Sequence, residues 1–285
     1  MTQRRLLQTD PLSPTADFEA FEATTWEDRA GGYERFFAEI TDRTIDAVLD
    51  AARVGRGTRL LDVACGPGDV AGTAAARGAS ATGIDITDAM TAIARVRWPN
   101  AEFRVADAHD LPFADASFDA VTASFALMHL GRPERAADEW VRVIVPGGRL
   151  AVAVWDDPSQ IALFGEILDA LEASGARPAD IPDGPSFFRF AADREMRSLL
   201  ARHAMTDVTI RTVAFTHRVA DTAAVWDGIL NGSVRTAAAI RGQSPAIQQR
   251  VHDDFTERME RYRSGLELEL PISVKVASGT VPKLP

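Results

Sequence analysis

The stretch Leu61-Asp62-Val63-Ala64-Cys65-Gly66-Pro67-Gly68 decides the fold of this chain. Its first half is apolar, as a buried strand requires, and its second half is a turn with glycines two positions apart. Glycine lets a ligand lie against the backbone and readily adopts the positive φ of a tight turn. A helix that begins directly after such a turn points unpaired N–H groups at the ligand. The stretch therefore predicts a strand, a ligand-binding turn and a helix.

Short apolar runs alternate with helical segments after this turn. The predicted strands cover residues 58–64, 80–84, 102–106, 118–124 and 149–155. Between them, helices end near Arg77 and Arg97, Asp88 caps one helix, and Pro133 takes the favoured first position of another. This repetition with short connections indicates an α/β fold, in which a parallel sheet is covered by helices on both faces.

Charge and composition exclude several classes of function. The formal net charge is −10 and no basic stripe is present, which argues against a nucleic-acid partner. Cys65 is the only cysteine, so we expect no internal disulfide, and no Cys/His cluster has the spacing of a metal site. No apolar run approaches the roughly 18 residues of a membrane span. We therefore expect a soluble, cytoplasmic protein without a metal.

An acidic residue ends the second predicted strand. Asp85 follows the glycine turn at about the distance at which an acid binds the ribose hydroxyls of an adenosine. The alternative is that Asp85 only caps the next turn. At the end of the third strand, Asp107 can accept from an adenine amine, and its apolar neighbours can flank the ring. The turn also satisfies a dinucleotide fingerprint through Gly66, Gly68 and Ala71, so an NAD-binding site is the competing interpretation.

Four segments taken together resemble a known family. They are DVACGPG (62–68), GID (83–85), ADAHDLPFADASFDAV (106–121) and E-x-x-R-V-x-x-PGG-R (139–149). In this order they resemble the motifs of class I S-adenosylmethionine (SAM)-dependent methyltransferases, particularly the ubiquinone and menaquinone group. The resemblance spans about residues 26–156. It implies a Rossmann-like seven-stranded sheet of order 3-2-1-4-5-7-6 with an antiparallel last strand.

The resemblance also implies a cofactor site. SAM would be bound as the cofactor and released as S-adenosylhomocysteine (SAH). The implied cofactor-binding residues are Trp26, Tyr33, Asp62, Ala64, Cys65, Gly66, Gly68, Asp85, Ile86, Met90, Asp107, Ala108 and Phe125. The chain departs from the family at Ala64-Cys65, where members often have glycine, although both residues are small.

The rhythm of strands and helices changes on either side of this core. Residues 1–16 are predicted to be a mobile tail, and residues 17–57 are predicted to be helices interrupted at Gly31-Gly32. We interpret 17–285 as one domain with a cofactor-binding core at 58–155 and lid insertions at 156–206 and 218–265. The later predicted helices are 161–173, one capped by Asp193, 221–240 and 244–263, and the later strands are 207–217 and 266–277.

Methyl transfer from a sulfonium requires little from the protein. The donor is already activated, so the enzyme aligns the acceptor, excludes water and, for a hydroxyl acceptor, removes a proton. His129 follows the fourth strand and is the candidate base, although a histidine that only bonds at a helix end would look the same. His109 and Glu166 are weaker candidates. Aromatic residues after the core could line an apolar pocket or only pack the lid; they are Phe187, Phe188, Phe190 and Trp226.

The leading hypothesis is methylation of oxygen, nitrogen or carbon on a small, partly apolar organic acceptor. Lys275 and Lys283 are the only lysines, which indicates a GC-rich coding background, and a large lid in that background suits secondary metabolism. The alternative is a SAM-binding protein without methyl transfer, either cyclase-like or a regulatory module. The sequence leaves a monomer and a homodimer equally open.

Overall fold

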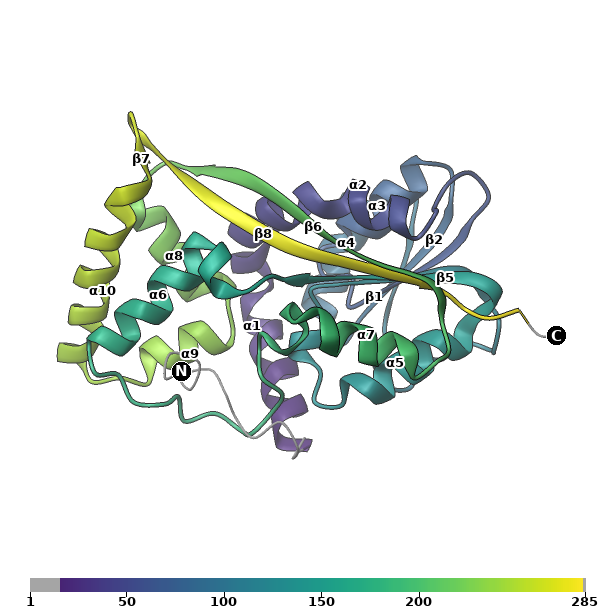
Figure 1. The fold of residues 1–285 in the computed structure, drawn as a ribbon, viewed down its shortest axis with the longest axis horizontal. Helices are drawn as coiled ribbons and strands as arrows, with labels where there is room; N and C mark the ends of the chain where they lie inside the picture. Colours follow the sequence, from purple (N-terminus) through teal and green to yellow (C-terminus); the bar gives the residue numbers. More distant parts are fainter. Residues whose placement is uncertain (1–15, 284–285) are drawn as a thin grey trace.

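The computed structural model describes residues 16–283, which form one eight-stranded sheet with helices on both faces (Figure 1). The strand order is β3-β2-β1-β4-β5-β8-β6, and the short β7 pairs only with β8. β8 inserts between β5 and β6 and is antiparallel to both. The predicted order and the antiparallel last strand are therefore confirmed, with β8 in the place of the expected seventh strand and one extra strand, β7.

The strands begin and end close to the predicted positions. They are β1 (Arg59–Val63), β2 (Ser80–Asp85), β3 (Glu102–Val105), β4 (Phe118–Ser124), β5 (Ile144–Trp155), β6 (Thr206–Val219), β7 (Arg263–Ser264) and β8 (Glu267–Thr280). β5 begins earlier than predicted because Ile144 already pairs with Phe118 of β4. The register shifts between Ile144 and Arg149, the segment that contains the Pro146-Gly147-Gly148 turn. Gly147 keeps the positive φ, +86°, expected of that turn.

Helices cover the sheet and form a separate group at one end. The α-helices are α1 (Ala16–Thr41), α2 (Ile45–Ala51), α3 (Asp69–Ala76), α4 (Asp88–Arg97), α5 (Pro133–Val143), α6 (Ala162–Ala173), α7 (Asp193–Ala201), α8 (Thr222–Gly232), α9 (Arg235–Arg241) and α10 (Pro245–Met259). The 3-10 helices are η2 (Asp42–Thr44), η3 (Leu127–His129), η4 (Pro158–Gln160), η5 (Arg189–Ala191) and η6 (Glu260–Tyr262). α7 packs on β6, whereas α6, α8, α9 and α10 gather beyond one end of the sheet (Figure 1). None of the helices within residues 16–283 is long and apolar enough to cross a membrane.

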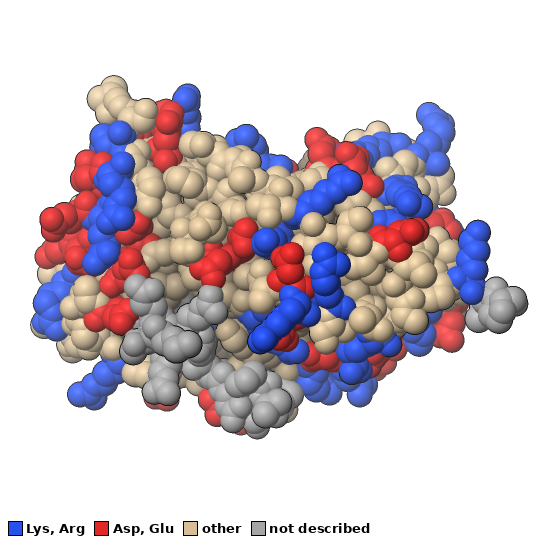
Figure 2. Space-filling view, in the orientation of Figure 1, with Lys and Arg blue, Asp and Glu red and all other residues tan. Residues whose placement is uncertain are grey.

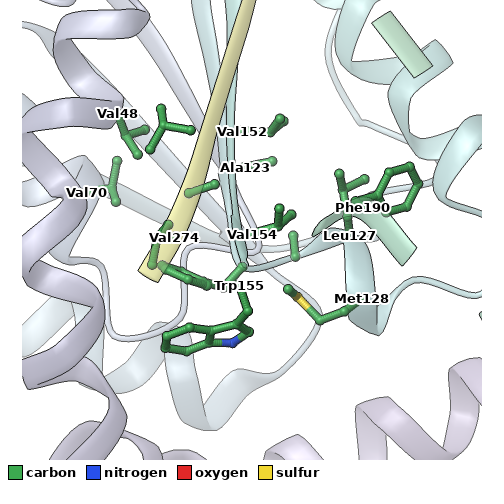
Figure 3. Packing of buried hydrophobic residues seen from close by; sticks show 14 of the residues in the cluster. Val48, Val70, Ala123, Leu127, Met128, Val152, Val154, Trp155, Phe190 and Val274 are labelled. Carbon is green, nitrogen blue, oxygen red and sulfur yellow. The ribbon is translucent and has the colours of Figure 1, made fainter. Parts of the chain in front are cut away.

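The hydrophobic core lies on both sides of the central strands (Figure 3). Val48 of α2 and Val70 of α3 pack on one face, and Leu127 and Phe190 pack on the other. These side chains are apolar and close-packed, which anchors the sheet between its two helical layers. On the surface, Lys and Arg side chains are interspersed with Asp and Glu, so the face in view carries mixed charge (Figure 2).

Several predicted helix ends are corrected. The cap of α4 is Thr87 and not Asp88, because the Thr87 hydroxyl accepts from the Met90 amide. Asp193 is the first residue of α7, and its predecessor Ala192 makes no side-chain cap. The helix predicted over 221–240 breaks at Ser233, which lies in an extended conformation between α8 and α9. The predicted tail, residues 1–16, lies outside the described residues except for Ala16.

The predicted break at Gly31-Gly32 is wrong, because α1 runs through both glycines without interruption. Gly32 is needed for a close crossing with α8. A Cβ on Gly32 would lie 1.9 Å from the Asn231 carbonyl oxygen, and a Cβ on Gly232 would lie 3.0 Å from the Gly32 oxygen. The glycines therefore bring two helices together at their backbones and do not end a helix.

We expect Gly32→Ala to destabilise the protein, because the added methyl group meets backbone that cannot move aside. Overpacking of this kind costs about 1–3 kcal/mol. Gly31→Ala is the matched control, since its Cβ would meet only the flexible end of Arg35, at 3.2 Å. Alanine is favoured over glycine inside a helix by about 0.5–1 kcal/mol, so this variant should be neutral or more stable. Urea unfolding of both variants measures the difference, and equal stabilities would contradict the crossing.

Candidate active site

One cavity of about 370 Å³ opens at the carboxyl ends of the parallel strands. The residues that follow β1, β2, β3 and β4 line it, and α1 and the start of α9 close it from the other side. Ligands of open α/β sheets bind at this edge, and the volume lies in the range of small-molecule sites. Of the predicted cofactor residues, all except Gly68 line this cavity: Trp26, Tyr33, Asp62, Ala64, Cys65, Gly66, Asp85, Ile86, Met90, Asp107, Ala108 and Phe125.

The two glycines of the glycine turn have different roles, one at the cavity and one in the packing of the fold. Gly66 has φ +52°, and a Cβ there would meet only the Met90 sulfur, at 4.0 Å, so its backbone stays open to the cavity. Gly68 has φ +89° and packs the other way, where a Cβ would lie 2.8 Å from Ala94 and Phe103. Gly68 therefore acts behind the loop, in the packing of α3 on its neighbours, and does not face the cavity.

Two residues without glycine's freedom also adopt positive φ at the cavity wall. Ala64 after β1 has φ +54° and Phe125 after β4 has φ +56°. This region is uncommon for a residue with a Cβ, and such strain gathers at binding sites. The conformation at Ala64 explains why a glycine suits this position. Cys65 is buried, which raises the pKa of its thiol well above the ordinary value, so this sulfur acts in packing.

Asp85 holds the glycine turn and faces the cavity. One carboxylate oxygen accepts from the Gly66 amide at 2.9 Å, and the other accepts from the Thr87 amide at 3.1 Å and its hydroxyl at 2.9 Å. Burial raises the pKa of this carboxyl, and the hydrogen bonds from Thr87 and Gly66 oppose the rise. A carboxylate has about four acceptor sites, so capacity remains for further donors. Asp85 thus orders the turn and can also receive hydroxyl groups.

Asp62 offers an unused acceptor to the same cavity. One of its oxygens accepts from the Thr122 hydroxyl at 2.8 Å, whereas the other is buried and has no hydrogen bond within the described residues. Buried polar atoms in native proteins are nearly always paired. Burial, with Asp69 and Asp85 nearby, raises the pKa of Asp62 to about 7. The site therefore suits a ligand that brings a donor or a positive charge to Asp62.

The raised pKa makes the stability of the ligand-free protein depend on pH. The pKa of Asp62 is about 7 in the folded protein and 3.8 in an ordinary environment, so the folded state holds the extra proton. This contribution is complete below about pH 4 and is lost as the pH rises to about 7. We expect Asp62→Asn, which cannot ionise, to gain about 2 kcal/mol relative to the wild type between pH 5 and pH 8. Thermal unfolding at both pH values measures this, and a constant difference would contradict it.

Aromatic side chains surround the rest of the cavity. Neighbouring rings lie 5.0–6.2 Å apart and close into a circle, which we call the aromatic belt. Its members, in order, are Trp26, Tyr33, Phe37, Phe164, Phe187 and His129. Trp155 and Phe125, 4.5 Å apart, continue it toward the sheet. The sequence predicted Trp26, Tyr33, Phe125 and Phe187 at the site, but it gave no reason to select Phe37, Phe164 or Trp155 among other apolar helix and strand positions.

A buried ionic group holds His129 in this belt. The His129 Nδ1 lies 2.9 Å from one oxygen of Glu22, and the other oxygen accepts from the Arg235 Nε at 2.9 Å. Burial by itself would raise the pKa of Glu22, but His129 and Arg235 lower it below the ordinary value. Glu22 is therefore a buried carboxylate. Neither Glu22 nor Arg235 was predicted, because a single charged residue in a helix gives no sign of which way it faces.

The weaker candidates for the site, His109, Glu166 and the predicted pocket aromatics, do not all lie at the cavity. His109 lines the cavity, with its Nδ1 2.8 Å from the Asp107 carboxylate. Glu166 lies outside the cavity and accepts from the Tyr262 hydroxyl at 2.7 Å. Phe188 and Glu166 line a separate pocket, and Trp226 packs on His252 and Phe255. Of the four aromatic residues predicted for the pocket, Phe187 alone lines the cavity among the residues that the structure describes.

Comparisons with known proteins identify the family. Residues 61–152 match the family described as a methyltransferase domain. The demethylmenaquinone methyltransferase of Paenarthrobacter aurescens is 33% identical over 176 residues, which cover 59% of this chain and 70% of that protein. The chain belongs to the class I SAM-dependent methyltransferases. The family's cofactor is SAM, as the sequence motifs predicted.

Other relatives of this methyltransferase match over shorter regions. The demethylmenaquinone methyltransferase of Renibacterium salmoninarum is 41% identical over 39% of this chain and 47% of its own length. The ubiquinone/menaquinone biosynthesis C-methyltransferase of Azotobacter vinelandii is 35% identical over 50% of this chain and 56% of its own length. The chain thus spans about half the length of these two relatives.

Solved structures confirm the methyltransferase fold. The YcgJ protein of Bacillus subtilis has a TM-score of 0.53 and 17% identity, covering 85% of this chain and 99% of that one. A phosphoethanolamine N-methyltransferase of Haemonchus contortus, in complex with SAH, has a TM-score of 0.56 and 15% identity, covering 96% and 62%. At identities this low, these two comparisons establish the shared fold alone.

Proposed function

We propose that this protein transfers a methyl group from SAM to a small, partly apolar organic acceptor. The observation that carries the proposal is the convergence of the predicted cofactor residues on one cavity, where a buried oxygen of Asp62 has no partner within the described residues. Asp62, Asp85 and Asp107 come from the ends of three different strands. A merely structural role would not require three acidic side chains at the same edge of the sheet.

The residues present fit SAM. Asp85 would accept from the ribose hydroxyls, Asp107 and Ala108 would lie at the adenine, and the open backbone of Gly66 would lie beside the methionine portion. The unpaired Asp62 oxygen suits the ammonium group, because a charged donor and acceptor make the stronger hydrogen bonds. The Haemonchus contortus structure contains SAH in the same fold, which supports this assignment. When bound, SAM supplies a methyl group that its sulfonium charge has already activated.

The chain's own residues would bind the acceptor, orient it and shield it from water. The aromatic belt excludes water from the acceptor end of the cavity, and aromatic faces attract a cation by about 0.5–2 kcal/mol. An apolar acceptor that packs between these rings would be held near the open glycine turn. The names of the relatives, which act on demethylmenaquinone, support an apolar ring as acceptor. Cytoplasmic location, a role in secondary metabolism and the choice between monomer and homodimer stay predictions.

Calorimetric titration with SAM, SAH and NAD tests the proposal. We expect micromolar binding of SAM and SAH and no binding of NAD. A library of phenols, amines, quinones and thiols is then incubated with the protein and SAM, and SAH formation is measured. Binding of NAD in place of SAM would overturn the family-based assignment of the cavity. Binding of SAM without SAH formation from any acceptor would favour the alternative, a cyclase-like enzyme or a regulatory module.

A further inference from the structure

The carboxylate of Glu22 is shared between two partners from distant segments. Its side chain is 4% exposed and that of Arg235 is 1% exposed. Besides Glu22, Arg235 donates to the Pro185 and Met128 carbonyl oxygens, each at 2.6 Å. α1, η3 and the start of α9 therefore meet at this group. A buried carboxylate without such a partner would be strongly destabilising, so Arg235 is what allows Glu22 to stay ionised there.

The charge on Glu22 fixes the tautomer of His129. An ionised carboxylate is only an acceptor, so the Nδ1 facing it carries the proton. In the neutral ring the Nε2 then holds a lone pair. His129 lines the cavity, and no hydrogen bond to its Nε2 is present within the described residues. The ring cannot turn freely, because Trp26 and Phe187 pack edge-on against it at 5.0 and 5.6 Å.

The surroundings of His129 indicate what this lone pair meets. The neighbouring wall is the aromatic belt, which suits an apolar, flat molecule. The two glutamates of α1 at the cavity are already paired, Glu22 with Arg235 and Glu19 with Arg132 at 2.8 Å. Neither carboxylate is free to attract a cationic acceptor. This end of the cavity therefore offers an acceptor apolar rings and the His129 Nε2 lone pair, which suit a weakly acidic hydroxyl group.

We propose that Glu22 and Arg235 position His129 as the proton acceptor for a hydroxyl group on an aromatic or enolic acceptor, so that the protein is an O-methyltransferase. This inference rests on the proposed methyl transfer. The acceptor O–H bond breaks and its proton passes to the His129 Nε2, while the oxygen electron pair forms the bond to the methyl carbon. The electron pair of the broken carbon–sulfur bond goes to sulfur, which leaves SAH. The resulting imidazolium is stabilised by Glu22 and later returns its proton to water.

The tautomer can be measured without any activity. In nitrogen-15 NMR spectra of the full chain, we expect a histidine signal with a protonated Nδ1 and an unprotonated Nε2 that disappears in His129→Asn. His109, whose Nδ1 faces the Asp107 carboxylate at 2.8 Å, should give a similar signal that remains in this variant. The double variant Glu22→Gln/Arg235→Met removes both charges together, so that neither is left buried and unpaired. In this variant the acceptor-only carboxylate is replaced by an amide, which can face the ring with its oxygen or with its NH2 group, so both tautomers of His129 should be populated. A wild-type His129 with its proton on Nε2, or a tautomer unchanged in the double variant, would overturn the positioning role.

A chromogenic phenol tests the acceptor class. 4-Nitrophenol is titrated into the protein saturated with SAH, and phenolate is read from its absorbance at constant pH. We expect binding to raise the phenolate fraction in the wild type and not in His129→Asn or the double variant. 4-Nitroanisole, which has no proton to give, should show no phenolate absorbance with any of the three proteins. Failure of 4-nitrophenol to bind, or an equal phenolate fraction in the wild type and His129→Asn, would overturn the inference. If the wild type does not bind SAM in the calorimetric titration described above, the proposed function itself is overturned, and this outcome is measured separately from the phenolate test.

Discussion

Replacing Asp85 with alanine is expected to weaken SAM binding at least about 100-fold. A hydrogen bond to a charged acceptor contributes about 1.5–3 kcal/mol, and two ribose hydroxyls would lose this acceptor together. The change also frees the Gly66 amide, which Asp85 holds at 2.9 Å, so the glycine turn loses part of its order. Calorimetric titration of SAM into the wild type and the variant measures the loss.

Two further variants separate the contributions of Asp85. Asp85→Asn keeps an acceptor for the Gly66 amide but removes the charge, and its affinity should fall between those of the wild type and the alanine variant. Asp88→Ala removes an exposed carboxylate in the first turn of α4, outside the cavity, and should bind SAM like the wild type. If Asp85→Ala binds within about threefold of the wild type, Asp85 serves the fold and not the ribose.

Replacing Arg235 with methionine is expected to lower the free energy of unfolding by about 3–5 kcal/mol. The change leaves the Glu22 carboxylate buried with only the His129 ring as a hydrogen-bond partner, and removal of one partner of a buried ion pair is costly on this scale. The Pro185 and Met128 carbonyl groups also lose their donor. Urea unfolding at pH 8 measures the effect.

The double variant and a surface pair are the controls for Arg235. Glu22→Gln/Arg235→Met should recover most of the lost stability, because no unpaired charge remains. Glu134→Gln breaks a 2.5 Å pair with Arg189 in which both side chains are about a quarter to a third exposed, and it should cost no more than about 1 kcal/mol. A loss below 1 kcal/mol in Arg235→Met would show that the Glu22 charge is compensated by other means.

The cofactor edge of the sheet could be predicted from the sequence because its signals are local. The glycine turn and Asp107 follow a strand within a few residues, Asp85 ends one, and parallel strands end at the same edge. Once the strands are recognised, the fold places these residues at one edge of the sheet. The residues that close the cavity from the other side could not be predicted in this way. Glu22 and Arg235 are 213 positions apart and meet only because α1 packs on α8, which brings the start of α9 to Glu22.

The N-terminal helix shows the same limit in another form. Two adjacent glycines predict a break when only local preference is considered. In α1 the burial of Gly32 against Asn231 outweighs that preference, because the crossing with α8 has room only for a glycine. Similarly, Gly68 belongs to the ligand motif in sequence but packs against Phe103 in the fold. The local sequence pattern predicts one role for each of these glycines, and the tertiary contacts determine the role that it actually has.

The position of β8 has a consequence for how the protein is made. On the ribosome, β1 to β5 and the helices α6 to α10 emerge before β8, which pairs with β5 from Arg149↔Thr280 to Trp155↔Val274. Until then the outer edge of β5 stays unpaired, and open strand edges recruit other chains. The nascent protein therefore passes through a stage in which its nucleoside-binding half is present while an apolar strand is still bare. A chaperone that covers this edge until β8 has emerged should raise the yield of folded enzyme.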